Sequence, residues 1–198
     1  MEVSVSRRVF YRRREGPRRY TSVVWMSGAK SVLFIGGRAG VGKTRVALEL
    51  HWQLAAQGVK HCVVEGDTLD QAYPPPWEHG HKLAEQNLKA MWANYRALGY
   101  RRMIYTNTVS VLETASLSAA MGDAPLVKAV LLRASDDTVK GRLELRESAA
   151  TLQSHLNRSR LKAAGLGQQT PSWVWRIDTD GKDSPAVAAE ILELLSWT

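Results

Sequence analysis

The chain has 198 residues, 44% of them apolar and 23% charged, and this predicts one globular domain with a hydrophobic core of its own. Its single cysteine, Cys62, excludes an internal disulfide and a metal site built from cysteines. The sequence holds neither an apolar run of the roughly 18 residues that a membrane span needs nor a signal-peptide pattern, so we expect a cytoplasmic protein.

The formal net charge of +8 is concentrated in residues 1–25. This segment holds seven arginines and two glutamates, which leaves only +3 for the rest of the chain. Blocks of like charge are usually disordered, and some act as arms for nucleic acid or anionic surfaces. An over-extended start ahead of Met26 or an idle tail is favoured over a nucleic-acid arm. Residues 26–198 are expected to form a single domain.

Apolar runs typical of buried strands then alternate with segments of helical periodicity. Strands are expected at 32–35, 59–67, 101–107, 125–132 and 173–178. Helices are expected at 44–57, 82–99, 109–121 and 136–147 and from 184 onward, with Ser135 and Ser184 as N-caps. This alternation predicts an α/β fold with a parallel sheet covered on both faces.

The stretch from Gly37 to Thr44, the P-loop, matches G-x-x-x-x-G-K-[ST] between a strand and a helix. Glycine permits positive φ, so successive N–H groups can converge on one anion, and the helix N-terminus adds partial positive charge. Lys43 is expected to reach the β- and γ-phosphates, and Thr44 to offer its hydroxyl to Mg²⁺. The motif predicts nucleoside triphosphate binding but no particular reaction. The residues expected to bind ATP are Gly37, Arg38, Ala39, Gly40, Val41, Gly42, Lys43, Thr44 and Arg45.

With this motif, the chain resembles the small P-loop kinases that phosphorylate nucleotides and metabolites. Gluconate kinase, adenylyl-sulfate kinase, antibiotic phosphotransferases and the tunicamycin-resistance ATP-binding proteins are members. The resemblance covers about residues 30–196. It implies a three-layer P-loop NTPase fold, with a five-stranded parallel sheet and a helical lid at about 146–168. It also implies ATP and Mg²⁺ as cofactors and a small-molecule phosphate acceptor as partner.

The second strand ends in VEGDTLD. In the metabolite kinases a similar strand ends in an Asp that contacts the acceptor hydroxyl, so the resemblance implies this role for Asp67. A carboxylate there could orient the hydroxyl, accept its proton or hold water on Mg²⁺. Asp67 is therefore a catalytic candidate and, with Thr44, a metal candidate. Alternatively, Asp67 and Asp70 cap the next turn. The third strand ends with Thr106 and Asn107, without the acid that many P-loop ATPases place there, which argues against a motor-type ATPase.

The segment after Ser135 resembles the family's lid, where arginines close over the phosphates. Guanidinium groups stabilise the charge that phosphoryl transfer builds up, through paired hydrogen bonds. The resemblance implies this role for Arg142, Arg146 and Arg158, with Arg160 a weaker candidate. The alternative is a solvated charged helix.

The acceptor pocket is expected after the second strand, where Tyr73 and Trp77 flank three prolines. Together with Trp92 and Tyr95 they could form an aromatic wall, which suits a sugar or another ring better than a small charged acid. The alternative is a stiff loop whose aromatics pack on the core. The strand that ends at 178–179 is expected near the adenine ring.

The leading hypothesis is an ATP-dependent phosphotransferase that acts on a hydroxyl of a small metabolite or antibiotic. One alternative is a nucleotide-binding regulatory or resistance protein without this activity. The other is a kinase of nucleotides or nucleic acid. The sequence leaves the acceptor open.

Overall fold

The computed structural model describes residues 29–145, 149–195 and 197. In this part of the chain a single five-stranded sheet has the order β2-β3-β1-β4-β5, and all its strand pairs are parallel. The strands are β1 (Ser31–Gly36), β2 (Cys62–Glu65), β3 (Arg102–Thr106), β4 (Leu126–Arg133) and β5 (Trp175–Asp178). The strand that leads into the P-loop therefore lies at the centre, and the predicted five-stranded parallel sheet is confirmed.

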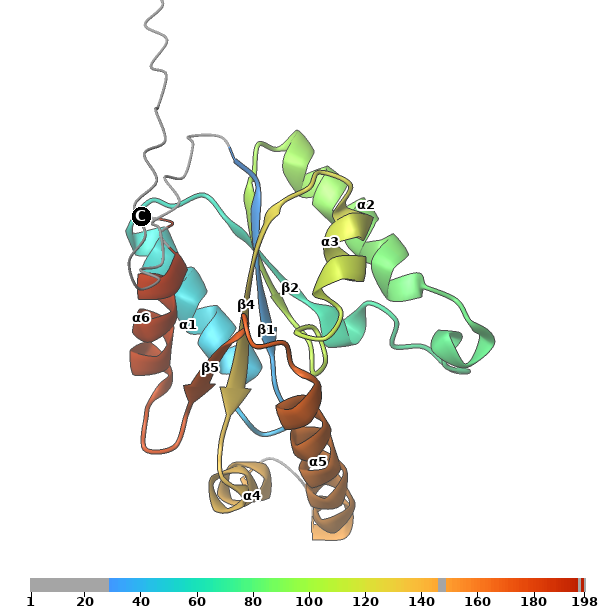
Figure 1. Ribbon diagram of the computed structural model, residues 1–198, viewed down its shortest axis with the longest axis vertical. Helices are drawn as coiled ribbons and strands as arrows, with labels where there is room; N and C mark the ends of the chain where they lie inside the picture. The colour runs from blue at the N-terminus through green and yellow to red at the C-terminus, as the bar shows by residue number, and fades with distance from the viewer. Residues whose placement is uncertain (1–28, 146–148, 196, 198) are drawn as a thin grey trace, which may run out of the picture.

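Helices cover both faces of the sheet (Figure 1). They are α1 (Lys43–Ala56), α2 (Leu83–Ala97), α3 (Thr114–Met121), α4 (Asp136–Glu144), α5 (Ala149–Gln169) and α6 (Ser184–Leu195), with short 3₁₀ helices η1 (Gly66–Thr68) and η2 (Pro76–His79). Helices α1 and α6 pack on one face and α2 and α3 on the other, while α4 and α5 lie beyond the carboxyl ends of the strands (Figure 1). No helix of the described residues is long and apolar enough to cross a membrane.

The central strand β1 is buried along its whole length. Its side chains alternate between two core clusters, with Val32 and Phe34 facing α2 and α3 and Leu33 and Ile35 facing α1 and α6. A continuous apolar run is what a parallel strand covered on both faces requires. Burial on both sides fixes the end of β1, and with it the start of the P-loop.

Helix α3 begins at Thr114, so the expected start at residue 109 was wrong. The Asn107 side chain accepts a hydrogen bond of 2.8 Å from the backbone N–H of Val109, which holds the chain in a turn directly after β3. Asn competes with helical hydrogen bonding in this way, and an apolar pattern alone does not reveal it.

One of the two predicted N-caps is confirmed. Ser135 accepts from the N–H of Thr138 at the start of α4. At α6 the capping side chain is Asp183, which accepts from the N–H of Ala186 at 2.9 Å, so the assignment to Ser184 was wrong by one residue. Both residues are good caps by type, and only the backbone geometry selects between them.

Candidate functional site

The P-loop connects the carboxyl end of β1 to the first turn of α1. Gly37, Gly40 and Gly42 have φ values of +145°, +82° and +105°. A Cβ atom at Gly37 would lie 2.8 Å from the carbonyl oxygen of Leu132, and one at Gly40 would lie 2.9 Å from Val139 Cγ1. Conformation and space therefore both require glycine here. The result is a loop of backbone that ends at a helix N-terminus, the arrangement that binds phosphate.

Lys43 lies folded over this loop. Its Nζ donates to the carbonyl oxygen of Gly37 at 2.9 Å and to that of Arg38 at 3.5 Å, and the residue is 8% exposed. A β- or γ-phosphate bound in the P-loop would therefore lie within reach of this ammonium group. The predicted role of Lys43 as a phosphate ligand remains a prediction.

A carboxylate contacts the P-loop hydroxyl, and it belongs to Glu65. The Thr44 hydroxyl donates to Glu65 Oε2 at 2.9 Å, and the Thr106 hydroxyl donates to Glu65 Oε1 at 2.8 Å. Glu65 is the last residue of β2, and it reaches past the end of β3 because the side chain there, Thr106, is short. Sequence reasoning missed Glu65, although it stands two residues before Asp67.

Asp67 lies on η1, directly beyond Glu65, with an exposed side chain. Its Oδ1 accepts from the backbone N–H of Thr108 at 3.2 Å, which links the segments that follow β2 and β3. The side chain is therefore tethered at the carboxyl edge of the sheet and open to solvent. Its predicted contact with an acceptor hydroxyl remains a prediction.

Gly66, between these two carboxylates, is packed against Tyr105. A Cβ atom there would lie 2.3 Å from the Tyr105 hydroxyl oxygen. Because Tyr105 is 1% exposed and cannot move aside freely, we expect Gly66→Ala to lower the free energy of unfolding by roughly 1–3 kcal/mol. Urea unfolding followed by tryptophan fluorescence measures this.

The control is Gly141→Ala on α4, where an added Cβ has no atom within 4 Å. It should raise stability by roughly 0.5–1 kcal/mol, since alanine is the better helix former. Equal effects of the two substitutions would refute the packing argument.

Of the predicted lid arginines, one is bound to the P-loop and one is exposed to solvent. Arg142 donates from Nη1 to the carbonyl oxygen of Val41 at 3.0 Å and from Nη2 to the carbonyl oxygen of Thr179 at 3.0 Å. It therefore joins the P-loop to the segment after β5. Arg158 is exposed on α5, and Arg146 lies outside the described residues. Their predicted contacts with phosphate remain predictions.

Three more residues that were predicted to bind ATP differ in how far their side chains are exposed to solvent. Val41 is 1% exposed and packs in the core, so its side chain anchors the loop. The Ala39 and Arg45 side chains are exposed at the two ends of the loop. For Val41 and Ala39, any contact with phosphate would be made by the backbone, since neither side chain carries a polar group.

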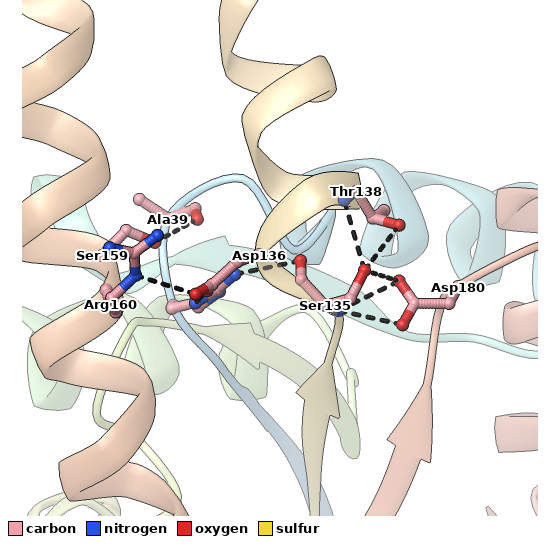
Figure 2. A network of polar contacts seen from close by, with 8 residues as sticks. Ala39, Ser135, Asp136, Thr138, Ser159, Arg160 and Asp180 are labelled. Carbon is pink, nitrogen blue, oxygen red and sulfur yellow. Dashed lines mark hydrogen bonds and ion pairs between the residues drawn. The ribbon is translucent and has the colours of Figure 1, made fainter.

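Helix α5, which occupies the predicted lid segment, is connected to the P-loop by polar contacts (Figure 2). The Ser159 hydroxyl donates to the carbonyl oxygen of Ala39 at 2.9 Å. Arg160 Nε donates to Asp136 Oδ2 at 2.8 Å, and Arg38 Nη1 donates to Asp136 Oδ1 at 2.6 Å. Asp136 thus joins an arginine of the P-loop to an arginine of the lid helix.

The same figure shows the start of α4 bound to the segment after β5. The N–H and the hydroxyl of Ser135 both donate to the Asp180 carboxylate, at 2.9 and 3.2 Å. Hydrogen bonds from Thr138 and Ser135 hold the pKa of Asp180 below its ordinary value. The anionic form is therefore favoured, and it fixes two segments that border the P-loop.

Hydrogen bonds from Arg38 and then Arg160 likewise lower the pKa of Asp136. A lowered pKa means that the link is complete at neutral pH and is lost as the pH falls below the ordinary value of 3.8. We expect Asp136→Asn to speed amide hydrogen exchange in α5 at neutral pH by up to about tenfold, because both arginines lose their anionic acceptor. Exchange followed by mass spectrometry measures this.

Asp137→Asn is the matched control, since Asp137 is exposed in the same helical turn. It should leave exchange in α5 unchanged. An equal effect at both positions would show that the helix terminus, rather than the link through Asp136, controls α5.

The expected aromatic wall is not assembled from its four residues. Trp92 is 1% exposed, and its indole N–H donates to Asp123, so it is a core residue. Tyr95 lines a different cavity at the edge of the sheet. Tyr73 and Trp77 are 97% and 55% exposed in the loop before α2. Helical spacing could not distinguish the face that covers the sheet from one that lines a pocket.

No protein-family model matches the sequence, and no curated protein does. Solved structures do match. The tunicamycin resistance protein of Deinococcus radiodurans is 24% identical, with 85% of this chain and 97% of that chain covered and a TM-score of 0.56.

Two enzymes are similar at lower identity. The APS kinase of Mycobacterium tuberculosis, in complex with AMPPNP and APS, is 18% identical, covers 84% of this chain and 98% of its own, and has a TM-score of 0.52. The shikimate kinase of Acinetobacter baumannii, in complex with shikimate, is 14% identical, with 85% and 94% covered and a TM-score of 0.54. The chain therefore has the three-layer α/β fold of the small P-loop kinases, as its sequence predicted.

Proposed function

We propose that the protein is an ATP-dependent phosphotransferase that transfers the γ-phosphate to a hydroxyl group of a small molecule. The observation that carries this proposal is the hydrogen bond between Thr44 and Glu65. It brings a carboxylate from β2 to the end of the phosphate-binding loop, on the edge that also carries Asp67. Phosphoryl transfer is mainly positioning and charge stabilisation, and these elements supply both.

The donor atoms of this site fit Mg²⁺. Thr44 offers a hydroxyl and Glu65 a carboxylate, and oxygen ligands of this kind are what Mg²⁺ prefers, together with water and phosphate oxygens. These two residues would hold the metal directly or through water. When bound, Mg²⁺ would neutralise charge on the β- and γ-phosphates. Lys43 would bind the same phosphates, and the backbone of the P-loop would orient them.

The acceptor is expected beside Asp67, on the side of the P-loop nearer to β2 and β3. Asp67 would accept a hydrogen bond from the acceptor hydroxyl and receive its proton as the new bond forms. Burial raises the pKa of Tyr105, and the negative charges of Glu113, Asp67, Asp70 and Glu85 raise it further, so four carboxylates lie near Tyr105 at this part of the sheet. A neutral or cationic acceptor is favoured over an acid on this ground.

The position of helix α5 favours a phosphotransferase over an enzyme that only hydrolyses ATP. It contacts the loop through Ser159 and is tied to Arg38 through Asp136, so it lies where it can shield the phosphates from water. Excluding water favours transfer to a bound acceptor over hydrolysis. The same helix supplies Arg158 and Arg160, which are expected to approach the transferred phosphate when the lid closes.

The test uses ATP labelled on the γ-phosphate, with Mg²⁺ and a small-molecule extract. The wild-type protein should produce a new labelled small molecule. Lys43→Ala and Asp67→Asn should both abolish it, since one lacks the phosphate ligand and the other the acceptor ligand. Binding of ATP without any labelled product would favour the nucleotide-binding regulatory or resistance protein instead.

A further inference from the structure

A cavity of about 310 Å³ lies at the β2 edge of the sheet, apart from the P-loop. Its walls include Leu48 and His51 of α1, Cys62 at the start of β2 with His61 just before it, and Tyr95 of α2 with Tyr100 just after that helix. This volume lies at the lower end of the range of small-molecule sites. His51 follows Thr44 by seven residues on α1, or about 10 Å at 1.5 Å per residue, so the cavity is separate from the phosphate site.

One side of the cavity is aromatic. The rings of Tyr95 and Tyr100 meet edge to face, with centroids 5.5 Å apart and an angle of 74° between their planes. Leu48 lies on the opposite helix and is 43% exposed, although it is a large apolar residue. A flat ring between these side chains would bury apolar surface on both of its faces.

The other side carries two histidines whose tautomers follow from their contacts. His61 Nδ1 lies 2.7 Å from the carbonyl oxygen of Val59, which can only accept, so Nδ1 carries the hydrogen. In neutral His61, Nε2 is then an acceptor. His51 Nδ1, 2.9 Å from that nitrogen, must donate to it. A further proton on the pair would therefore go to Nε2 of His51, which makes His51 a cation.

The surrounding charges are compatible with an anion. Burial lowers the pKa of His61, and the charges of His51 and Arg102 lower it further, so His61 stays neutral. Lys60 lies near the cavity, with its Nζ 4.8 Å from the centre of the Tyr100 ring. Burial raises the pKa of the Cys62 thiol to about 12, so it carries no charge. The described residues that line the cavity include no carboxylate.

We propose that this cavity binds a small aromatic carboxylate. The ring packs between Leu48 and the two tyrosines, and the carboxylate pairs with the protonated His51. His61 holds the imidazolium in place by accepting its Nδ1 hydrogen. An aromatic amine lacks the charge for His51, and an aliphatic acid lacks the ring that fits the two tyrosines.

Titration calorimetry of the full chain with benzoate as the probe tests this proposal. Benzoate should bind with a dissociation constant of about 1 mM, as expected for so small a ligand. Benzamide, which has the same shape without the charge, should bind at least about tenfold more weakly. Failure of benzoate to bind, or equal binding of benzamide, overturns the proposal.

His51→Asn should weaken benzoate binding at least about tenfold, and His79→Asn, an exposed histidine of η2, should not change it. Unchanged affinity in His51→Asn would also refute the site. The comparison of benzoate with benzamide on the wild type keeps the test decisive if this variant folds poorly. Lys43→Ala should bind benzoate normally, so the result is independent of whether the protein is a phosphotransferase.

Discussion

Replacement of Lys43 by alanine is expected to lower the rate of ATP consumption by roughly 10³-fold, because a charged ligand of the transferred phosphate is lost. Lys43 lies over the P-loop on the carbonyl oxygens of Gly37 and Arg38. The same nitrogen can donate to phosphate oxygens when ATP binds. Steady-state turnover at saturating ATP, together with calorimetric titration of ATP, separates the loss of rate from the loss of binding.

Lys89→Ala is the control, since Lys89 is an exposed lysine on α2. It should leave turnover and ATP affinity unchanged. Turnover of Lys43→Ala within about threefold of the wild type would show that the loop does not act through its lysine.

The second large effect is expected for Glu65→Gln, which should lower turnover by roughly 10²-fold at limiting Mg²⁺. Glutamine keeps the shape of the side chain and can still hydrogen bond to Thr44 and Thr106, so the substitution removes mainly the charge. A neutral amide binds Mg²⁺ much less well than a carboxylate. Turnover measured against Mg²⁺ concentration should show a raised half-saturation value and partial recovery at high Mg²⁺.

Glu193→Gln, on the exposed side of α6, is the matched control and should behave as the wild type does. If Glu65→Gln and the wild type show the same dependence on Mg²⁺, Glu65 only links β2 to the end of β3 and the start of α1 and has no part in metal binding.

The conformation of the P-loop could be predicted from the sequence because all its determinants are local. Gly37, Gly40 and Gly42 adopt the positive φ angles that the motif implies, and α1 starts at Lys43. The parallel sheet could also be predicted, since apolar runs such as 32–35 are long enough to be buried on both faces.

Glu65 could not be assigned in the same way, because its contact depends on the order of the strands. Its carboxylate reaches Thr44 across the end of β3, and this is possible only where that end carries a small side chain such as Thr106. The sequence shows that an acid is missing from the third strand. It does not show that a neighbouring strand supplies one.

The partners of the arginine side chains could not be predicted from the sequence either. Helical spacing could place Arg142 on a face with its neighbours, but its contacts with Val41 and Thr179 depend on how α4 packs below the P-loop. Similarly, nothing local to Asp136 indicates that it joins Arg38 to Arg160. Long side chains bind whatever tertiary packing brings within reach, so their partners are the least predictable part of the site.

The rate of ADP formation from ATP and Mg²⁺, measured with and without a small-molecule extract, tests most directly whether the protein is a phosphotransferase. A phosphotransferase that excludes water should consume ATP slowly alone and at least about tenfold faster when the acceptor is present. The added ADP should be matched by a phosphorylated small molecule, and Asp67→Asn should remove the acceleration. The same rate with and without extract, with all the phosphate released to water, would contradict the proposed function.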